Sequence, residues 1–305
     1  MKKLLSTILS AMLVVSMTVA SASALTFVEI KGSNRYQTSA LIADKQNYTT
    51  AILVNSTKSI ADGLSASALA GAANAPILLV KQNEIPADVE LRLECTNKIY
   101  IIGSENAISK NIEDRLKKSG FIVSRIGGKN RYETSVNVGN EVKRVKGGAS
   151  ETFIVNGTKG EADAMSISSV AARDSAPVIL TDGKTISADA KKIVNSIPNR
   201  YAIGLQGVMD ESLVESIGAT RVGGKNRFET NKKIINTFYK NVASYYLSKS
   251  DQLVDALAAS PITKYSPIVL VNKNSDKSVL KGAQKMTALG GIDSATIESC
   301  KKAAQ

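Results

Sequence analysis

One short motif occurs three times along the chain, and it limits the possible folds more than any other feature. Its best copies occupy residues 128–134 and 224–230 and read Gly-Lys-Asn-Arg-Tyr-Glu-Thr and Gly-Lys-Asn-Arg-Phe-Glu-Thr. A degraded copy, Gly-Ser-Asn-Arg-Tyr-Gln-Thr, occupies residues 32–38. Self-similarity at a fixed spacing is the signature of tandem structural units. The chain is therefore predicted to contain three units of one design.

The spacing of the motif sets the expected unit boundaries. The motif arginines, Arg35, Arg131 and Arg227, are separated by 96 residues each. We predict a first unit over residues 25–124, a second over 125–220 and a third over 221–305. Units of this length are near the lower end of ordinary domain size.

Apolar strands and helical segments alternate within each unit. In the first unit, apolar runs occupy residues 27–30, 51–54, 77–80 and 98–103, and equivalent runs recur in the other two units. Uniformly apolar strands between helices are typical of parallel sheets that are covered on both faces. The predicted fold class is α/β, with a βαβαβαβα order and one small parallel sheet in each unit.

The motif itself is predicted to begin a helix. Asn34, Asn130 and Asn226 are suitable N-caps, and Glu133 and Glu229 follow three residues after their caps, as in a capping box. Two interpretations remain open. In the first, the motif is a capped helix start whose arginine packs locally. In the second, it is an anion site, because helix N-termini attract phosphate and arginines suit bidentate phosphate contacts.

Residues 1–24 are predicted to be a secretory signal peptide. Lys2 and Lys3 precede an apolar run over residues 4–20, and small residues complete an Ala-x-Ala cleavage site at Ala24. The mature chain is expected to begin at Leu25, and a retained membrane anchor is the alternative. No later segment is long and apolar enough to span a bilayer.

Missing residue types exclude several classes of function. The chain has no His, which rules out Ser-His-Asp and Cys-His nucleophile arrangements and imidazole-ligated zinc. It has no Trp, and no platform of aromatic rings for single-stranded nucleic acid is evident. We expect no cofactor, no metal and no nucleic-acid partner. Cys95 and Cys300 have no metal-ligand spacing, and they form either one long-range disulfide or two separate thiols.

Positive charge is concentrated in the third unit. From Arg221 onward the chain has 14 Lys and Arg against 6 Asp and Glu, a net charge of +8. This excess favours an anionic partner, and a merely Lys-rich soluble surface is the alternative. Lys225 and Arg227 are expected at the start of a helix. Lys233 and Lys240, seven residues apart, are expected to extend a cationic track along it.

One aspartate in each unit follows the second apolar run: Asp62, Asp163 and Asp255. Ligand sites of α/β proteins lie at the carboxyl ends of parallel strands, so each aspartate could act as a base or a magnesium ligand. Each one also opens an Ala-rich helix, where an N-cap is the simpler role. A lone carboxylate in each unit favours the N-cap interpretation.

Taken in order, these motifs resemble the clostridial cell-wall-binding type 2 repeat, which occurs in triplicate in surface proteins that include S-layer proteins. The resemblance rests on residues 125–134 and 221–230, on the Ala-Asp-[Gly/Ala]-[Leu/Met]-Ser segments and on the Pro-Ile-Leu-Leu type strands. It covers essentially the whole chain after residue 24. The first unit departs from the pattern at Glu29, Lys31 and Gln37.

The resemblance implies three Rossmann-like or Toprim-like units packed as a pseudo-threefold trimer within one chain. It implies non-covalent anchoring to the Gram-positive wall by binding an anionic polysaccharide, polysaccharide II in the best-known members. An apolar Ile-Leu-Leu run is associated with anchoring in that family, and its literal match here is Ile77, Leu78 and Leu79.

The predicted function is therefore non-catalytic, secreted cell-wall binding. The anionic wall polysaccharide is the expected partner, S-layer or other surface proteins are further candidates, and the mature chain is not expected to enter the membrane. The alternatives are an exported enzyme that uses the aspartates on wall polymer, and an extracellular solute-binding protein. The candidate polymer-binding residues are Arg35, Lys129, Arg131, Lys225, Arg227, Lys233, Lys240, Ile77, Leu78 and Leu79.

Overall fold

The computed structural model describes residues 25–57 and 60–305. The predicted signal peptide, residues 1–24, lies outside the described residues.

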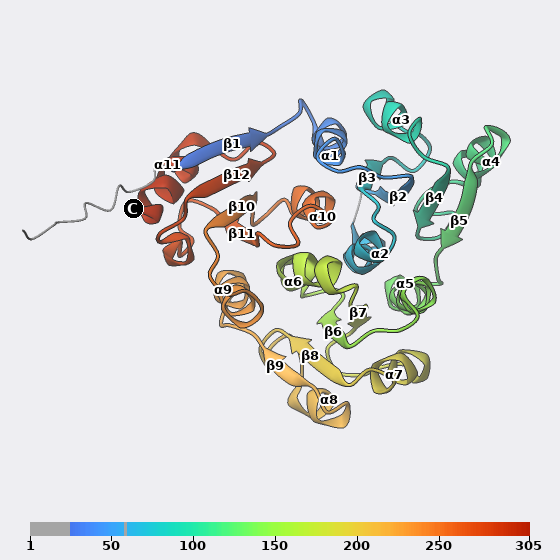
Figure 1. The fold of residues 1–305 in the computed structure, drawn as a ribbon. Helices are drawn as coiled ribbons and strands as arrows, with labels where there is room; N and C mark the ends of the chain where they lie inside the picture. Colours follow the sequence, from blue (N-terminus) through green and yellow to red (C-terminus); the bar gives the residue numbers. More distant parts are fainter. Residues whose placement is uncertain (1–24, 58–59) are drawn as a thin grey trace, which may run out of the picture.

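The strands of the described chain form three four-stranded parallel sheets. The strand orders are β3-β2-β4-β5 in the first sheet, β7-β6-β8-β9 in the second and β1-β12-β10-β11 in the third. Figure 1 shows the three sheets placed around a common centre, with helices on their faces. The predicted α/β class and its three small parallel sheets are confirmed.

Corresponding elements follow one another in the same order in the three parts of the chain. The first part contains α1 (Arg35–Ala43), β2 (Thr50–Asn55), η1 (Ala61–Ser65), α2 (Ala66–Ala72), β3 (Ile77–Val80), α3 (Ala87–Leu93), β4 (Lys98–Ile102), α4 (Lys110–Lys118) and β5 (Ile122–Ile126). The second contains α5 (Arg131–Lys146), β6 (Glu151–Asn156), α6 (Glu161–Asp174), β7 (Val178–Thr181), α7 (Ala188–Asn195), β8 (Asn199–Ile203), α8 (Glu211–Ser216) and β9 (Thr220–Val222). The third contains α9 (Arg227–Phe238), β10 (Ser244–Lys249), α10 (Val254–Ala259), β11 (Ile268–Val271), η2 (Ser278–Leu280), β12 (Lys285–Leu289) and α11 (Ser294–Ala304).

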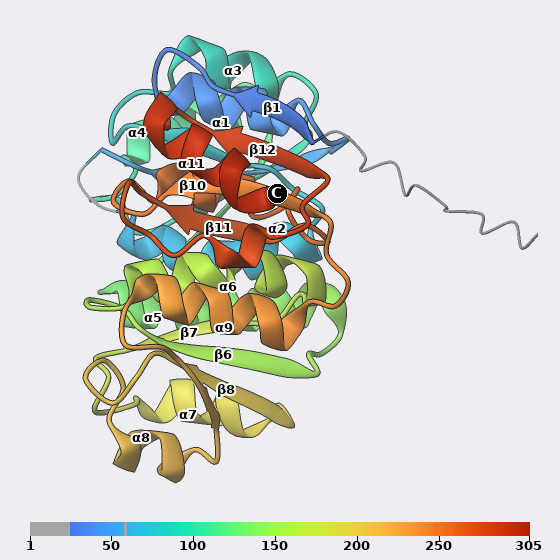
Figure 2. The ribbon, with the colours of Figure 1, turned by 90° about the vertical axis from the view of Figure 1, so that its left-hand side faces the viewer.

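The first strand does not join the sheet of the first unit. β1 (Thr26–Ile30) pairs in parallel with β12, and Ile30 lies opposite Leu289. The expected placement of residues 27–30 in the first unit's own sheet is therefore wrong. Without β1, β12 would present an unpaired edge, and sheet edges in natural proteins are normally covered. Figure 2 shows β1 beside β12, near the C-terminal helix α11.

The motif connects neighbouring units. β5 and β9 pair with β4 and β8, whereas the helices that follow them, α5 and α9, pack on β7 and β11 of the next sheet. In the same way, β1 lies in the third sheet and α1 packs on β3 of the first. Each copy of the motif therefore leaves one sheet and begins a helix on the next, and β1 closes the three units into a ring.

Three short-side-chain helices, α2, α6 and α10, meet at the centre of this ring (Figure 1). A Cβ atom on Gly71 of α2 would come within 1.8 Å of the Ala172 carbonyl oxygen of α6, so only glycine permits this approach. The buried hydroxyls of Ser169 and Thr263 share a hydrogen bond of 2.7 Å between α6 and the segment that follows α10. One hydrophobic core includes residues of all three units, so the units stabilise one another.

Candidate functional site

The three motif helices begin with the predicted capping box. Asn130 Oδ1 accepts hydrogen bonds of 3.0 Å from the backbone N–H groups of Tyr132 and Glu133, and Glu133 Oε2 accepts one of 3.0 Å from that of Lys129. The pattern recurs at α9 and, with Gln37 as the second acceptor, at α1. The capping interpretation is confirmed. Because side chains already occupy these amides, the described helix starts offer no ready phosphate cradle.

Each motif arginine reaches from its helix start to the end of a strand. Arg35 Nη1 donates to the Ser56 carbonyl oxygen at 2.6 Å, directly after β2. Arg131 and Arg227 make the same bond to the carbonyl groups that follow β6 and β10. Within the described chain, these guanidinium groups make no other hydrogen bond. Each arginine therefore orders a strand end and keeps N–H groups that a ligand could use.

The three aspartates lie in the first turn of their helices. α6 begins at Glu161 behind Gly160, α10 begins behind Leu253, and η1 begins behind Ile60. None of the aspartates is the cap residue, so the N-cap interpretation is wrong. The reason is that each helix starts one or two residues before the aspartate, which turns its side chain inward.

A glycine at the end of a neighbouring strand makes room for each carboxylate. A Cβ atom on Gly103, Gly204 or Gly290 would meet the Oδ2 atom of Asp62, Asp163 or Asp255 at 2.9, 3.0 or 2.1 Å. All three glycines have positive φ angles, which other residues rarely adopt. The same Asp–Gly packing is therefore built into every unit.

Two of these carboxyl groups are buried at junctions between units. Asp163 and Asp255 are each 6% exposed, and burial raises the pKa of both to about 6. Groups nearby oppose this effect: the Thr230 hydroxyl and the charge of Arg227 lower the pKa of Asp163, and the charges of Lys249 and Arg35 lower the pKa of Asp255. Each aspartate is thus electrostatically coupled to the next unit.

Asp163 faces a hollow of about 650 Å³ that we call the junction hollow. Its charged lining residues come from the second and third units: Lys159, Glu161, Asp163, Lys225, Arg227 and Asp251. The volume is typical of a ligand site. Three cationic groups can bind phosphate or carboxylate, and the carboxylates can accept hydrogen bonds from hydroxyls. This combination suits a charged saccharide.

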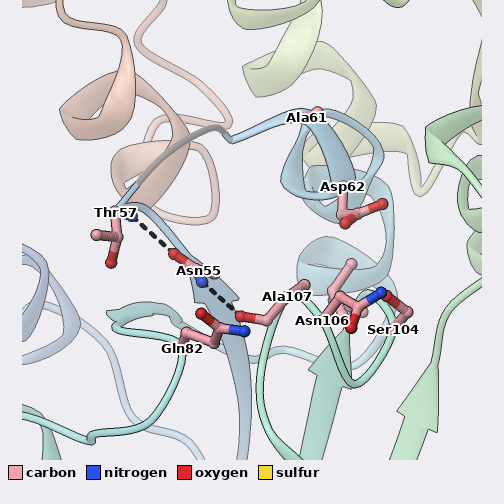
Figure 3. A pocket seen from close by; sticks show the side chains of 9 residues that line it. Asn55, Thr57, Ala61, Asp62, Gln82, Ser104, Asn106 and Ala107 are labelled. Atoms are coloured by element: carbon pink, nitrogen blue, oxygen red, sulfur yellow. Dashed lines mark hydrogen bonds between the residues drawn. The ribbon is translucent and has the colours of Figure 1, made fainter.

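A second hollow, of about 430 Å³, lies in the first unit at the carboxyl ends of β2, β3 and β4. Figure 3 shows Asn55, Gln82, Asn106 and Ser104 around it, with Asp62 on η1 at its far side. Asn55 donates to the Ala107 carbonyl oxygen and accepts from the Thr57 N–H group at 2.7 Å. We call this the amide-lined hollow.

The structure separates the predicted polymer-binding lysines. Lys225 lines the junction hollow, and Lys129 is exposed beside the start of α5. Lys233 donates to the Gly223 carbonyl oxygen at 2.7 Å. Lys240 lies beyond the end of α9 at Phe238, far from the hollow at the helix start. The predicted track along one helix face does not form, because α9 ends before Lys240.

The apolar run of the first unit forms strand β3. Ile77, Leu78 and Leu79 are each 0% exposed, since both faces of the sheet are covered. Their side chains leave no surface for a polymer to contact. We therefore omit them from the proposed site, although they shape the strand that ends near Gln82.

Glu29, an exposed departure of the first unit, replaces an arginine that makes a packing contact in the other two units. Arg125 and Arg221 donate from Nη1 to the carbonyl oxygens of Gly103 and Gly204, at 3.1 and 2.9 Å. Glu29 takes the corresponding place in β1 and cannot donate in this way. Each of these arginines therefore holds its edge strand, β5 or β9, against the end of the neighbouring strand, β4 or β8.

Sequence reasoning missed several residues of the two hollows. Lys159 and Asp251 follow the ends of β6 and β10, while Gln82 and Asn106 follow the ends of β3 and β4. Their position after a parallel strand was the available signal. It is a weak one, because every strand is followed by polar loop residues.

The remaining predictions on cysteines, metals and membranes can be compared with the described residues. Cys95 is exposed, Cys300 is buried, and both are free thiols, so the disulfide alternative is wrong. In residues 25–57 and 60–305, no cluster of three His, Cys, Asp or Glu side chains is arranged to hold a metal ion. Within the same residues, no helix has the length and apolar character needed to cross a bilayer.

Comparison with known proteins gives consistent matches. The chain matches the family described as Cell wall binding domain 2 (CWB2) over residues 29–113, 125–214 and 221–296. It is 28% identical to the N-acetylmuramoyl-L-alanine amidase LytC of Bacillus subtilis, over 84% of this chain and 52% of that protein. It is 29% identical to the Amidase enhancer of the same organism, over 86% of this chain and 37% of that protein.

Two solved structures share the fold. Cwp6 from Clostridium difficile has a TM-score of 0.85 at 27% identity, covering 92% of this chain and 48% of that one. Cwp8 from the same organism has a TM-score of 0.83 at 31% identity, covering 92% and 52%. This chain thus spans about half the length, or less, of these relatives. Since all three repeats match in order, the chain belongs to the cell wall binding domain 2 family.

Proposed function

We propose that this protein is exported and attaches non-covalently to the Gram-positive cell wall by binding an anionic polysaccharide. The observation that carries the proposal is the junction hollow, where Lys159, Lys225 and Arg227 from two units face one space at the carboxyl ends of parallel strands. Ligand sites of open α/β sheets occur at this edge. The net charge of +8 in the third unit would attract a polyanion to the same region.

The protein is further proposed to hold the wall polymer without cleaving it. LytC is named as an amidase, but this chain corresponds to only 52% of it and belongs to the binding family. The chain has no His with which to build a nucleophile pair. S-layer or other surface proteins are additional candidate partners at the wall.

An exported wall hydrolase is the second candidate function. Asp163 supports it, because a carboxyl group with a pKa of about 6 beside a hollow is suited to general acid–base catalysis. Glu161 and Asp251 line the same hollow and would be its carboxylate partners.

One experiment separates these functions. Purified mature protein is incubated with intact cell walls and with purified anionic wall polysaccharide, and both retention and release of soluble fragments are measured. We expect retention that falls with salt and no release of fragments. Fragment release that Asp163→Asn abolishes would establish the hydrolase instead. Absence of retention on both materials would reject wall binding.

A further inference from the structure

The amide-lined hollow of the first unit differs in chemistry from the corresponding place in the second. Gln82, Ser104 and Asn106 line it. In the second unit, the residues that follow the matching strands by the same number of positions are Gly183, Leu205 and Gly207. Three hydrogen-bonding side chains thus occur in the first unit where the second unit has none. The repeat motif does not require them, since the second unit folds in the same way without them.

The side chains of Gln82, Ser104 and Asn106 are available to a ligand. In the part of the chain that the structure describes, none of them makes a hydrogen bond. Asn55, by contrast, uses both ends of its amide within the protein, on the Ala107 carbonyl and the Thr57 N–H group. The hollow therefore has a fixed wall and is lined by several amide and hydroxyl groups that have no hydrogen-bond partner among the described residues (Figure 3).

Charge further limits the kind of ligand. Asp62 places a carboxylate in the lining of the amide-lined hollow. A carboxylate repels phosphate and carboxylate groups but accepts hydrogen bonds from hydroxyls. Ala61 and Ala107 add small apolar surfaces against which the C–H face of a sugar ring can pack. The volume of about 430 Å³ is within the range of small-ligand sites.

We propose that the amide-lined hollow binds an uncharged, hydroxyl-rich sugar unit of the wall polysaccharide. Gln82, Ser104, Asn106 and Asp62 recognise its hydroxyl groups by direct hydrogen bonds. The inference rests on the proposed function, because it assigns one part of the same polymer to the first unit. The junction hollow then supplies charge-dependent attraction, while the first unit selects which sugar is bound.

Salt dependence separates the two contributions. Screening weakens attraction between exposed charges, since the Debye length falls from about 10 Å at 0.1 M salt to about 3 Å at 1 M. Hydrogen bonds between uncharged groups are not weakened in this way. The affinity of the full chain for purified anionic wall polysaccharide is therefore measured by calorimetry across this salt range for each variant.

The double variant Gln82→Ala/Asn106→Ala is expected to bind on the order of tenfold more weakly than wild type at every salt concentration, because it loses two neutral hydrogen bonds. Its salt dependence should equal that of wild type. Asn83→Ala is the matched control: this exposed amide is next to Gln82 in sequence but does not line the hollow, and it should bind as wild type does. Circular dichroism melting verifies that the variants fold.

Two results would overturn the inference. The first is wild-type affinity in a folded double variant. The second is a loss that disappears at high salt, which would make the contact electrostatic. Both leave the proposed function intact, because wild type still binds. Failure of wild type to bind any wall polysaccharide would reject the proposed function and this inference together. If the double variant does not fold, the single variant Gln82→Glu replaces it, because it keeps the side-chain size and adds a negative charge. Gln82→Glu should bind the polysaccharide more weakly than wild type. Undiminished binding by this variant would again overturn the inference.

Discussion

The buried aspartates at the junctions between units oppose folding at neutral pH. Asp163 and Asp255 are 6% exposed, and burial raises the pKa of each to about 6 from an ordinary value of 3.8. A raised pKa means that the folded state holds the proton more tightly than the unfolded state does. Each group therefore favours the folded state most below pH 3.8, and this contribution is lost as the pH rises through about 6. A buried, destabilising carboxylate beside a hollow is typical of a functional position.

Replacing Asp163 with Asn should stabilise the protein at neutral pH. A shift of about two pKa units corresponds to roughly 3 kcal/mol, of which the amide should recover about 1–3 kcal/mol. Urea unfolding of wild type and Asp163→Asn at pH 4 and pH 7.5 measures the difference. The gain should be present at pH 7.5 and small at pH 4. An equal gain at both values would show that proton binding is not its cause.

At the scale of single elements, the local character of the motif could be predicted from sequence, but its connections could not. Asn130 and Glu133 have the types and spacing of a capping box, and the hydrogen bonds confirm it. Nothing local in the motif indicates that its helix packs on a different sheet from the one that contains its strand. The same capping hydrogen bonds form whether the helix packs on that sheet or on the next one. The inward position of Asp163 was missed for a related reason: a shift of the helix start by three residues changes a cap into a buried side chain.

The cap of α9 offers a direct test at this scale. Asn226 Oδ1 accepts two backbone N–H groups, so Asn226→Ala should lower the free energy of unfolding by about 1 kcal/mol. Asn236→Ala, at an exposed position within the same helix, is the control and should have a smaller effect. Chemical denaturation of both variants gives the comparison. Equal losses would mean that the cap does not stabilise α9 as proposed.

For the whole molecule, the residues predicted three units and the resemblance implied their pseudo-threefold packing, but neither predicted that β1 closes the ring. The 96-residue spacing and the apolar runs lead directly to three α/β repeats. The position of β1 depends on which sheet edge is open once the rest of the chain has folded. The sequence of β1 itself does not indicate which edge that is. The two hollows could not be predicted either, because they combine loops that only the sheets bring together. The ranges 25–124, 125–220 and 221–305 remain a prediction about which segments act as units.

Deletion of residues 25–30 should destabilise the distant third sheet first. β1 covers the β12 edge, and every β1 residue pairs with one of β12. Hydrogen–deuterium exchange of the shortened chain should show lost protection in residues 285–289, while β6 and β7 of the second sheet remain protected. Preferential loss of protection in β2 and β4 would contradict the ring arrangement.

Deletion of residues 221–305 should be more severe than deletion of residues 25–30. It should abolish wall retention, because it removes the partner of β1 and half of the junction hollow.

The central claim is that the junction hollow binds a polyanion through its exposed cations, and the most direct test is a charge-matched comparison. Lys159→Ala/Lys225→Ala removes two lysines that line the hollow from different units, and Lys240→Ala/Lys285→Ala removes two exposed lysines outside its lining. Both variants lose the same net charge, so long-range attraction is equal. Circular dichroism verifies that both variants fold. The first variant should bind purified anionic wall polysaccharide at least tenfold more weakly than the second at 0.1 M salt, because contacts to charged groups contribute about 1.5–3 kcal/mol each. The affinity of the first variant should also depend less on salt. Equal affinities for the two variants would contradict the account.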